Sequence, residues 1–172
     1  MEETGRDVSG SHSIEDIFKV LKNEIDQSKE ERSLPPIALL LVDIDNLERF
    51  NRWYGRGVGN EILDTTAKIL MGLLKEGDLL ARFGGDEFLI LLRGVTLEAT
   101  REKARRVLGA IRDYKFDLHN LTLSVSIGIA YYFSFAFSPD EFLGCAVEAL
   151  TLAQKEGGTF KVFMEEEEWD EE

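Results

Sequence analysis

The sequence is poor in cysteine, in basic residues and in long apolar runs. Cys145 is its single cysteine among 172 residues, which excludes an internal disulfide framework and a cysteine-based zinc cluster and favours a reducing, cytoplasmic location. No apolar run approaches the ~18 residues that cross a bilayer, and the N-terminus lacks the basic and then apolar segments of a signal peptide. We therefore expect a soluble protein that is not inserted in a membrane.

Basic residues are outnumbered by acids, 20 against 33, which gives a formal net charge of −13. Much of the excess lies in residues 165–172, EEEEWDEE. Nucleic-acid phosphates require clusters of Lys and Arg, so a chain without a basic stripe is not expected to bind nucleic acid. The two histidines, His12 and His119, do not have the spacing of metal ligands.

The length and the 44% of hydrophobic residues predict one globular domain with its own core. We expect a flexible tail over residues 1–12, the domain over 13–164 and an acidic tail over 165–172. The first element of the domain is an amphipathic helix over 13–31, because its apolar residues recur at helical spacing.

Apolar periodicity also predicts the remaining elements. A continuous apolar run, 37–42, is typical of a buried strand. A long core-facing helix spans 58–74, with Gly77 as its stop, and a third helix begins after Thr96. Alternating apolar residues over 121–129 predict a half-buried strand that the aromatic segment 131–137 extends.

Two apolar runs, 79–83 and 88–92, flank Gly84, Gly85, Asp86 and Glu87. This pattern predicts a hairpin turned by glycines at positive φ, with the acids in the turn. A last helix, from Ser138 and Pro139 to Gly157, precedes a short strand over 159–163.

The element order is helix, strand, helix pair, hairpin, helix, strand, helix, strand. Hairpins mixed with crossover helices predict an α/β sandwich, in which one mainly antiparallel sheet of about five strands is flanked by helices.

Acidic residues follow or join the strands that should lie side by side. Asp43 and Asp45 stand where the first strand ends, and Asp86 and Glu87 stand in the hairpin turn. Carboxylates brought together repel unless a hard cation neutralises them, and Mg²⁺ accepts carboxylates, carbonyls, waters and phosphate oxygens. Taken singly, each acid is better explained as an ordinary turn residue. Together they predict a site for Mg²⁺ or Mn²⁺.

Four segments in series, LLLVDIDNLERFN, YGRGVGNEIL, LLARFGGDEFLILL and LTLSVSIGIA, resemble the GGDEF family of diguanylate cyclases. The resemblance covers residues 37 to about 163 and is most specific in RFGGDEF. It implies a palm-like, ferredoxin-related fold of the α+β type. It also implies an activity in which two domains, each holding one GTP, form cyclic di-GMP and pyrophosphate with Mg²⁺.

The resemblance assigns roles to the acids. Asp43 corresponds to the first metal ligand, with the Ile44 carbonyl as a second. Asp86 corresponds to the other metal carboxylate and to the acceptor of the 3′-hydroxyl proton. Glu87 is a neighbouring acid that supports the metal or the ribose.

Seven residues are predicted to bind substrate, most of them by their resemblance to positions of the family. The backbone N–H groups of Asn46 and Leu47 would meet phosphates near a helix start. The glycines of the turn would let substrate approach without a Cβ in the way. The side chains of Asn51 and Asn60 would face guanine. The whole predicted set is Asn46, Leu47, Asn51, Asn60, Gly84, Gly85 and Lys155.

The sequence departs from the family where cations bind phosphates. Glu48 stands where the family has Lys, and Gln154 and Gly158 replace the Lys and Arg that hold the triphosphate. Arg52, Arg56 and Lys155 are the nearby cations that could compensate. Asn60 itself replaces an Asp.

The inhibitory motif Arg-x-x-Asp of the family reads Lys75 to Asp78. Lys lacks the planar bidentate contact of Arg, so product binding here should be weak. The alternative is that Lys75 and Asp78 are a helix-end charge and a turn residue.

Two functions remain open from the sequence. One is a homodimeric diguanylate cyclase. The other is a catalytically degenerate GGDEF domain that binds a nucleotide or a regulatory protein partner. The retained acids favour the first function, and the depleted phosphate clamp favours the second.

Overall fold

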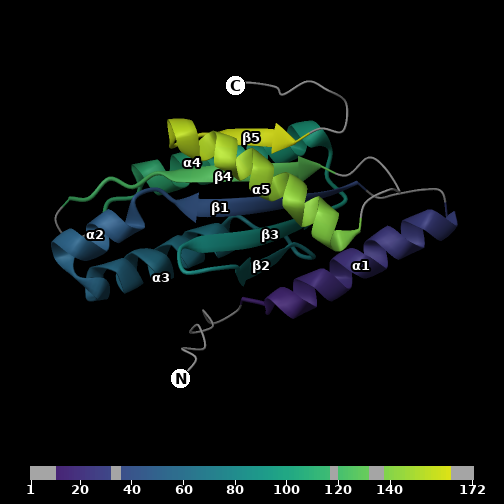
Figure 1. Cartoon of the computed structure of the whole chain (residues 1–172), viewed down its shortest axis with the longest axis horizontal. Helices are drawn as coiled ribbons and strands as arrows, with labels where there is room; N and C mark the ends of the chain where they lie inside the picture. Colours follow the sequence, from purple (N-terminus) through teal and green to yellow (C-terminus); the bar gives the residue numbers. More distant parts are fainter. Residues whose placement is uncertain (1–10, 32–35, 117–119, 132–137, 164–172) are drawn as a thin grey trace.

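The computed structural model describes residues 11–31, 36–116, 120–131 and 138–163. Within these residues one sheet has five strands in the order β2-β3-β1-β4-β5 (Figure 1). Neighbouring strands in the sheet are antiparallel, except β4 and β5, which are parallel. The predicted mainly antiparallel sheet is therefore confirmed. The strands are β1 (Ile37–Ile44), β2 (Leu79–Arg82), β3 (Glu87–Arg93), β4 (Val125–Tyr131) and β5 (Phe160–Phe163).

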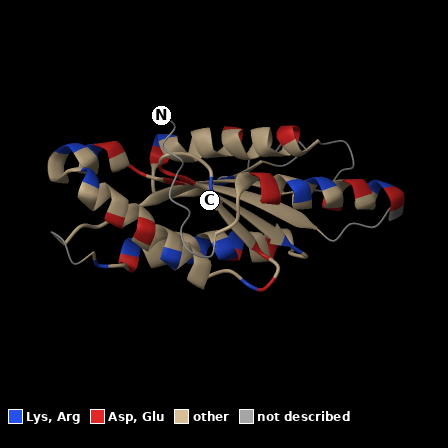
Figure 2. Cartoon of the chain, turned by 90° about the horizontal axis from the view of Figure 1, so that it is seen from below, with Lys and Arg blue, Asp and Glu red and all other residues tan. Residues whose placement is uncertain are grey.

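Helices cover both faces of the sheet. On one face α1 (Ile14–Glu31) and α5 (Pro139–Glu156) pack against alternate strand residues such as Leu39 and Leu89. The other face is covered by α2 (Leu47–Tyr54), α3 (Arg56–Gly72) and α4 (Leu97–Asp113). These helices pack against the intervening strand residues, such as Leu40 and Ile90. Figure 2 shows the charges on the helices and loops, with the strands largely uncoloured. The predicted sandwich is confirmed.

Local signals in the sequence account for the helix ends. The Ser138 side chain accepts from the backbone N–H of Glu141, and the Glu141 carboxylate accepts from the N–H of Ser138, which is a complete capping box at α5. Thr96 caps α4 in the same way through the N–H of Ala99. The helix predicted over 58–74 runs instead from Arg56 to Gly72.

Strand β4 differs from its prediction in two ways. Residues 121–124 are not strand, because β1, its partner, ends at Ile44 opposite Val125. The strand is also buried on both faces rather than half-buried. Its small residues, Ser126, Gly128 and Ala130, face α5, so the alternation reflects a close helix and not solvent.

Gly128 is the point of closest approach between β4 and α5. A Cβ built there would lie 2.1 Å from the Ala146 carbonyl oxygen and 2.3 Å from the Leu150 nitrogen. Both atoms belong to the helix backbone, so α5 could not move aside locally. Glycine at 128 therefore sets the spacing of this layer.

The topology gathers several chain segments at one edge of the sheet. β1 ends where β3 and β4 begin, since both run antiparallel to it. α5 ends and β5 begins at the same edge, because β5 runs parallel to β4. This edge carries the predicted acids. Outside the described residues lie the aromatic segment 131–137 except for Tyr131, residues 1–10 of the predicted N-terminal tail and the acidic tail 165–172. His12, which the sequence placed in the flexible tail, is described, and its backbone N–H donates to the Leu80 carbonyl at 2.8 Å. None of the described helices combines the length and the apolar content needed to cross a membrane.

Candidate active site at the sheet edge

Asp43 lies at the end of β1 on the face that α1 and α5 cover. In the sheet register it stands opposite Glu87 of β3 and opposite Ser126 of β4. The residue is only 9% exposed. The Gln154 amide, from α5, donates a hydrogen bond to Asp43 Oδ2 at 2.7 Å. Gln154, the residue at the family's Lys position, therefore holds the predicted metal carboxylate directly.

Burial and neighbouring acids raise the pKa of two carboxyl groups at this edge, those of Asp43 and Glu87. Burial, followed by the nearby charges of Asp86, Glu87 and Asp45, raises the pKa of Asp43 to about 7, although the Gln154 hydrogen bond opposes the shift. Burial and Asp86 likewise raise the pKa of Glu87. The predicted acids are therefore brought together, close enough for their charges to repel one another.

The hairpin turn that carries Asp86 is held by Arg82. Its guanidinium donates to the carbonyl of Gly84 at 3.2 Å and to that of Gly85 at 2.6 Å. The Arg82 side chain therefore stabilises the turn. The Asp86 carbonyl accepts from the Ile44 N–H at 3.2 Å, which fixes the turn beside the end of β1.

The prediction of positive φ at the two turn glycines is wrong, since neither Gly84 nor Gly85 lies in the left-handed region. Sterics and hydrogen bonds shape the turn instead. A Cβ at Gly84 would meet Glu87 Oε2 at 3.1 Å, whereas Gly85 has open space around it. Gly85 therefore leaves the approach to Asp86 clear.

Asp45 plays a structural part that the sequence did not reveal. Its carboxylate accepts from Ser124 Oγ at 2.5 Å, from Ser126 Oγ at 2.6 Å and from the Gly158 N–H at 2.9 Å. These bonds join the end of β1 to β4 and to the turn before β5. The signal available in the sequence was the pair of serines two residues apart, but their partner could not be read from it.

A hollow of about 510 Å³ opens beside this network. Neither Lys nor Arg contributes to its lining within the described part of the chain, although Glu156 does. Arg52, Arg56 and Lys155, the predicted compensating cations, are exposed elsewhere. The lining residues are Asp43, Asp45, Asn46, Ser124, Gln154, Glu156, Gly157 and Gly158.

The start of α2 faces the same hollow through Asn46. Asn46 has φ 60, and no side-chain hydrogen bond caps the helix. The first N–H groups of a helix lack intrahelical partners and attract anions. Leu47 is 4% exposed, with its side chain in the core, so only its backbone could meet a ligand.

Asn51 and Asn60 lie where α2 meets α3. Asn51 packs over Gly59, where a Cβ would come within 1.6 Å of Asn51 Oδ1. Gly59 is thus required for the position of the Asn51 amide. This role could not be predicted from its place in YGRGVG. Asn51 Oδ1 is buried without a hydrogen-bond donor among the described residues, and Asn60 is exposed.

Lys75 and Asp78 are in contact through a turn. The Lys75 backbone N–H donates to Asp78 Oδ2 at 2.9 Å, and the Asp78 N–H donates back to the Lys75 carbonyl at 3.1 Å. This geometry is that of the turn role which the sequence allowed as an alternative. The inhibitory site therefore stays a prediction, and its acid, Asp78, already accepts a hydrogen bond within the turn.

The donors available for a divalent cation are all oxygens. No group of three or more His, Cys, Asp and Glu suited to a metal occurs in the described residues. A site of two carboxylates, Asp43 and Asp86, with the Ile44 carbonyl does not need such a group. Hard oxygen donors with excess negative charge suit Mg²⁺, so the residues present fit the predicted ion.

A comparison with protein families matches residues 16–159 to the GGDEF domain of diguanylate cyclases. The chain belongs to this family. The match extends from α1 to the turn before β5, so it includes all four predicted acids of the edge, Asp43, Asp45, Asp86 and Glu87. Membership of the GGDEF family confirms the resemblance seen in the motifs.

Curated GGDEF relatives are longer than this chain. Diguanylate cyclase DosC of Escherichia coli is 30% identical over 143 residues, which are 80% of this chain and 30% of DosC. Diguanylate cyclase A of Treponema denticola is 29% identical over 98 residues, which are 56% of this chain and 26% of that protein. The chain thus spans less than a third of these relatives.

Solved GGDEF structures share the fold. The GGDEF domain of YfiN from Pseudomonas aeruginosa is 25% identical, with a TM-score of 0.82 over 91% of this chain and 92% of that one. The active GGEEF domain of a diguanylate cyclase from Vibrio cholerae has a TM-score of 0.81 at 19% identity, over 89% of this chain and 97% of that one. The palm-like fold of the GGDEF domains is thereby confirmed.

Proposed function

We propose that this domain is a diguanylate cyclase that binds GTP at the acidic edge and, as a pair of chains, condenses two GTP into cyclic di-GMP and two pyrophosphates. The observation that carries the proposal is the convergence of Asp43, Asp86 and Glu87 at one edge of the sheet, where burial first, and the charges of the neighbouring acids second, raise the pKa of Asp43 to about 7. Clustered carboxylates without a cation weaken a fold. Their presence is explained if a cation completes the site.

Asp43, Asp86 and the Ile44 carbonyl would hold the divalent ion in this proposal. When bound, such an ion stabilises charge on the attacking and leaving oxygens of a phosphoryl transfer. Asp86 would accept the proton of the 3′-hydroxyl, whose oxygen then bonds to the α-phosphorus of the other nucleotide as pyrophosphate leaves. Glu87 would support the ribose or the metal.

Guanine would lie at the junction of α2 and α3. Asn51 Oδ1, a buried acceptor without a donor among the described residues, suits a base that presents N–H donors, because an unpaired buried acceptor costs free energy. The uncapped start of α2 at Asn46 would face the phosphates. One site per domain means that two nucleotides require two chains related by a two-fold axis.

The deciding experiment incubates the purified chain with GTP and Mg²⁺ or Mn²⁺ and identifies products by mass. We expect cyclic di-GMP, with a rate per chain that rises with protein concentration. The absence of product from the native chain, at concentrations where GTP is bound, would reject the activity.

A second function, a degenerate GGDEF domain that regulates through binding, is favoured by one observation. The hollow that would receive phosphates has no Lys or Arg in its described lining, and Gln154 is bonded to Asp43 instead. The diguanylate cyclase SiaD has been solved with its activator SiaC, which makes a protein partner a reasonable candidate. GTP binding without turnover would support this function.

Glu48→Lys should strengthen GTP binding. Glu48 is exposed in the first turn of α2, beside the proposed phosphate position, so the change removes a repulsion and adds an attraction. We expect about tenfold tighter binding in Mg²⁺ by calorimetry, on the order of 1 to 2 kcal/mol. Glu61→Lys makes the same charge change on α3 and is the control. Equal or weaker binding by Glu48→Lys would show that position 48 does not face the phosphates.

Asn60→Asp should sharpen the preference for GTP over ATP. A carboxylate only accepts hydrogen bonds, so it suits the guanine N1–H and N2–H₂ donors and repels the adenine N1 acceptor. Asn offers both a donor and an acceptor. Competition binding measures the ratio, and Asn23→Asp on α1 serves as the control. If the ratio of GTP to ATP affinity does not rise, Asn60 does not contact the base.

A further inference from the structure

Residues of α2 and the start of α3 form an exposed surface that the proposed reaction does not use. We call this surface, Arg49, Arg52, Trp53, Tyr54 and Arg56, the basic aromatic patch. Trp53 is 61% exposed and Tyr54 37% exposed, and they are two of only four large apolar side chains exposed to this degree in the described residues. The Arg49 guanidinium stacks on the Trp53 ring at 4.6 Å. Such stacking holds an aromatic ring and a cation together at the surface.

Among the described residues, the arginines of the patch have no acidic partner. None of the three is within 4.0 Å of a carboxylate in the part of the chain that the structure describes, whereas Arg93 and Arg112, among others, are paired. The formal net charge of the chain is −13. Three guanidiniums without a carboxylate partner in the described residues, around an exposed indole, therefore form a positively charged surface on an acidic protein. An anionic partner with an aromatic or apolar group would complement this surface.

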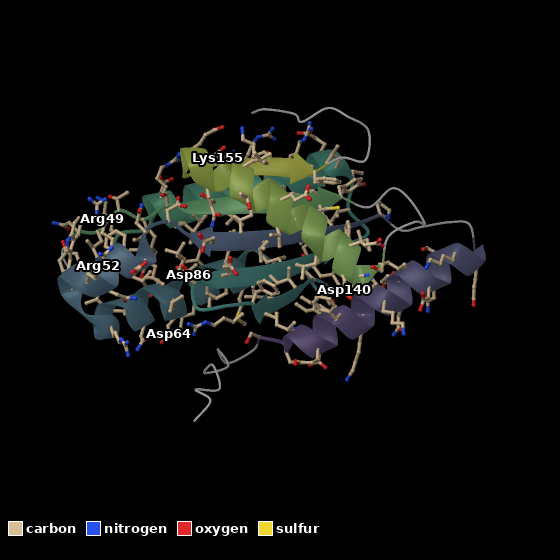
Figure 3. All side chains as sticks on the ribbon, viewed as in Figure 1. Arg49, Arg52, Asp64, Asp86, Asp140 and Lys155 are labelled. Carbon is tan, nitrogen blue, oxygen red and sulfur yellow. The ribbon has the colours of Figure 1, made fainter. Side chains whose placement is uncertain are left out.

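The chain itself contains a segment with that chemistry. Residues 165–172 hold seven acids and Trp169, and they follow β5 at the end of the described chain. β1 runs toward α2, β4 is antiparallel to β1 and β5 is parallel to β4. β5 therefore ends at the side of the sheet away from α2. In Figure 1 the arrowhead of β5 points away from α2, the helix on which Figure 3 labels Arg49 and Arg52.

We propose that the acidic segment 165–172 of one chain binds the basic aromatic patch of a second chain. The two complementary surfaces start from opposite ends of the sheet, so the contact between copies is head to tail. Each such pair leaves one patch and one acidic segment open, which lets further copies join. The contact differs from the two-fold pair proposed for catalysis, and it does not require nucleotide or metal.

Sedimentation velocity on the full chain, with chelator and without nucleotide, tests the proposal. We expect the mean mass to rise with protein concentration at about 20 mM salt and the association to weaken at least about tenfold at about 300 mM, because salt screens exposed charges. In a Trp169→Phe chain, Trp53 is the remaining tryptophan. Its emission should shift to shorter wavelength as association covers the indole.

Two variants make the test specific. The patch variant is Arg49→Gln, Arg52→Gln and Arg56→Gln, and the tail variant has the seven acids of residues 165–172 replaced by their amides. Each should stay monomeric alone, because it lacks one of the two surfaces. An equimolar mixture should form a complex of two chains that does not grow, since one intact patch meets one intact tail. Circular dichroism checks that both variants are folded.

A matched control replaces three exposed cations elsewhere, with Arg106→Gln, Arg112→Gln and Lys115→Gln, and should associate as the native chain does. Three results would overturn the proposal. They are a native chain that stays monomeric at low salt, a patch or tail variant that associates like the native chain, and a control that loses association. A tail that binds the patch of its own chain would give the first of these results.

Discussion

Gly128→Ala should lower the free energy of unfolding by about 3 kcal/mol or more. The added Cβ would lie 2.1 Å and 2.3 Å from backbone atoms of Ala146 and Leu150. Real contacts of this kind do not occur, so α5 must move away from β4 along its length. Urea unfolding followed by circular dichroism measures the loss.

Gly144→Ala is the matched control for Gly128→Ala. Gly144 lies within α5 itself, where a Cβ would meet nothing within 4 Å. Alanine in an open helical position stabilises by about 0.5 to 1 kcal/mol. The two substitutions should therefore change stability in opposite directions. A Gly128→Ala chain as stable as the native protein would mean that α5 packs less closely than the structure shows.

Asp43→Asn should make the metal-free protein more stable above pH 8. The pKa of Asp43 is raised from 3.8 to about 7 in the folded chain, chiefly by burial. Its contribution to stability is therefore complete below about pH 4 and is lost as the pH rises through about 7. The amide introduced by the substitution stays neutral throughout and can still accept from Gln154. We expect a gain of about 1 to 3 kcal/mol at pH 8 in chelator.

Divalent metal should make the native chain more stable than Asp43→Asn, the reverse of the order expected without metal. If Asp43 holds the ion, Mg²⁺ adds stability to the native chain and not to Asp43→Asn. Asp64→Asn, an exposed acid of α3 (Figure 3), controls for a general loss of negative charge and should leave both the pH profile and the metal effect unchanged. A native chain whose stability does not fall between pH 5 and pH 8 in chelator would contradict the burial of a charged Asp43.

Much of the fold could be predicted because its signals are local. The capping residues Ser138 and Thr96, the apolar run of β1 and the hairpin around Asp86 each act within a few residues. The error at β4 came from reading Ser126 and Gly128 as an exposed face. Small residues fit an open surface and a closely packed helix equally well, and only the packing of α5 distinguishes the two.

The candidate site could be predicted only where its parts are close in sequence or follow from the family resemblance. Asp43 and Asp86 were found because each ends a recognisable strand. The contact between Gln154 and Asp43 spans 111 residues, and nothing near either residue in the sequence encodes it. The bonds of Asp45 to Ser124, Ser126 and Gly158 were missed for the same reason.

The three bonds of Asp45 bear on the order in which the domain is made. Asp45 is synthesised early, but its partner Gly158 lies 113 residues later, and contacts so distant in sequence close late in folding. During translation the acidic edge should stay open until β5 leaves the ribosome. Pulsed hydrogen exchange on stalled chains should find the Gly158 amide protected only once β5 has emerged, which makes the addition of β5 the step at which the site becomes complete.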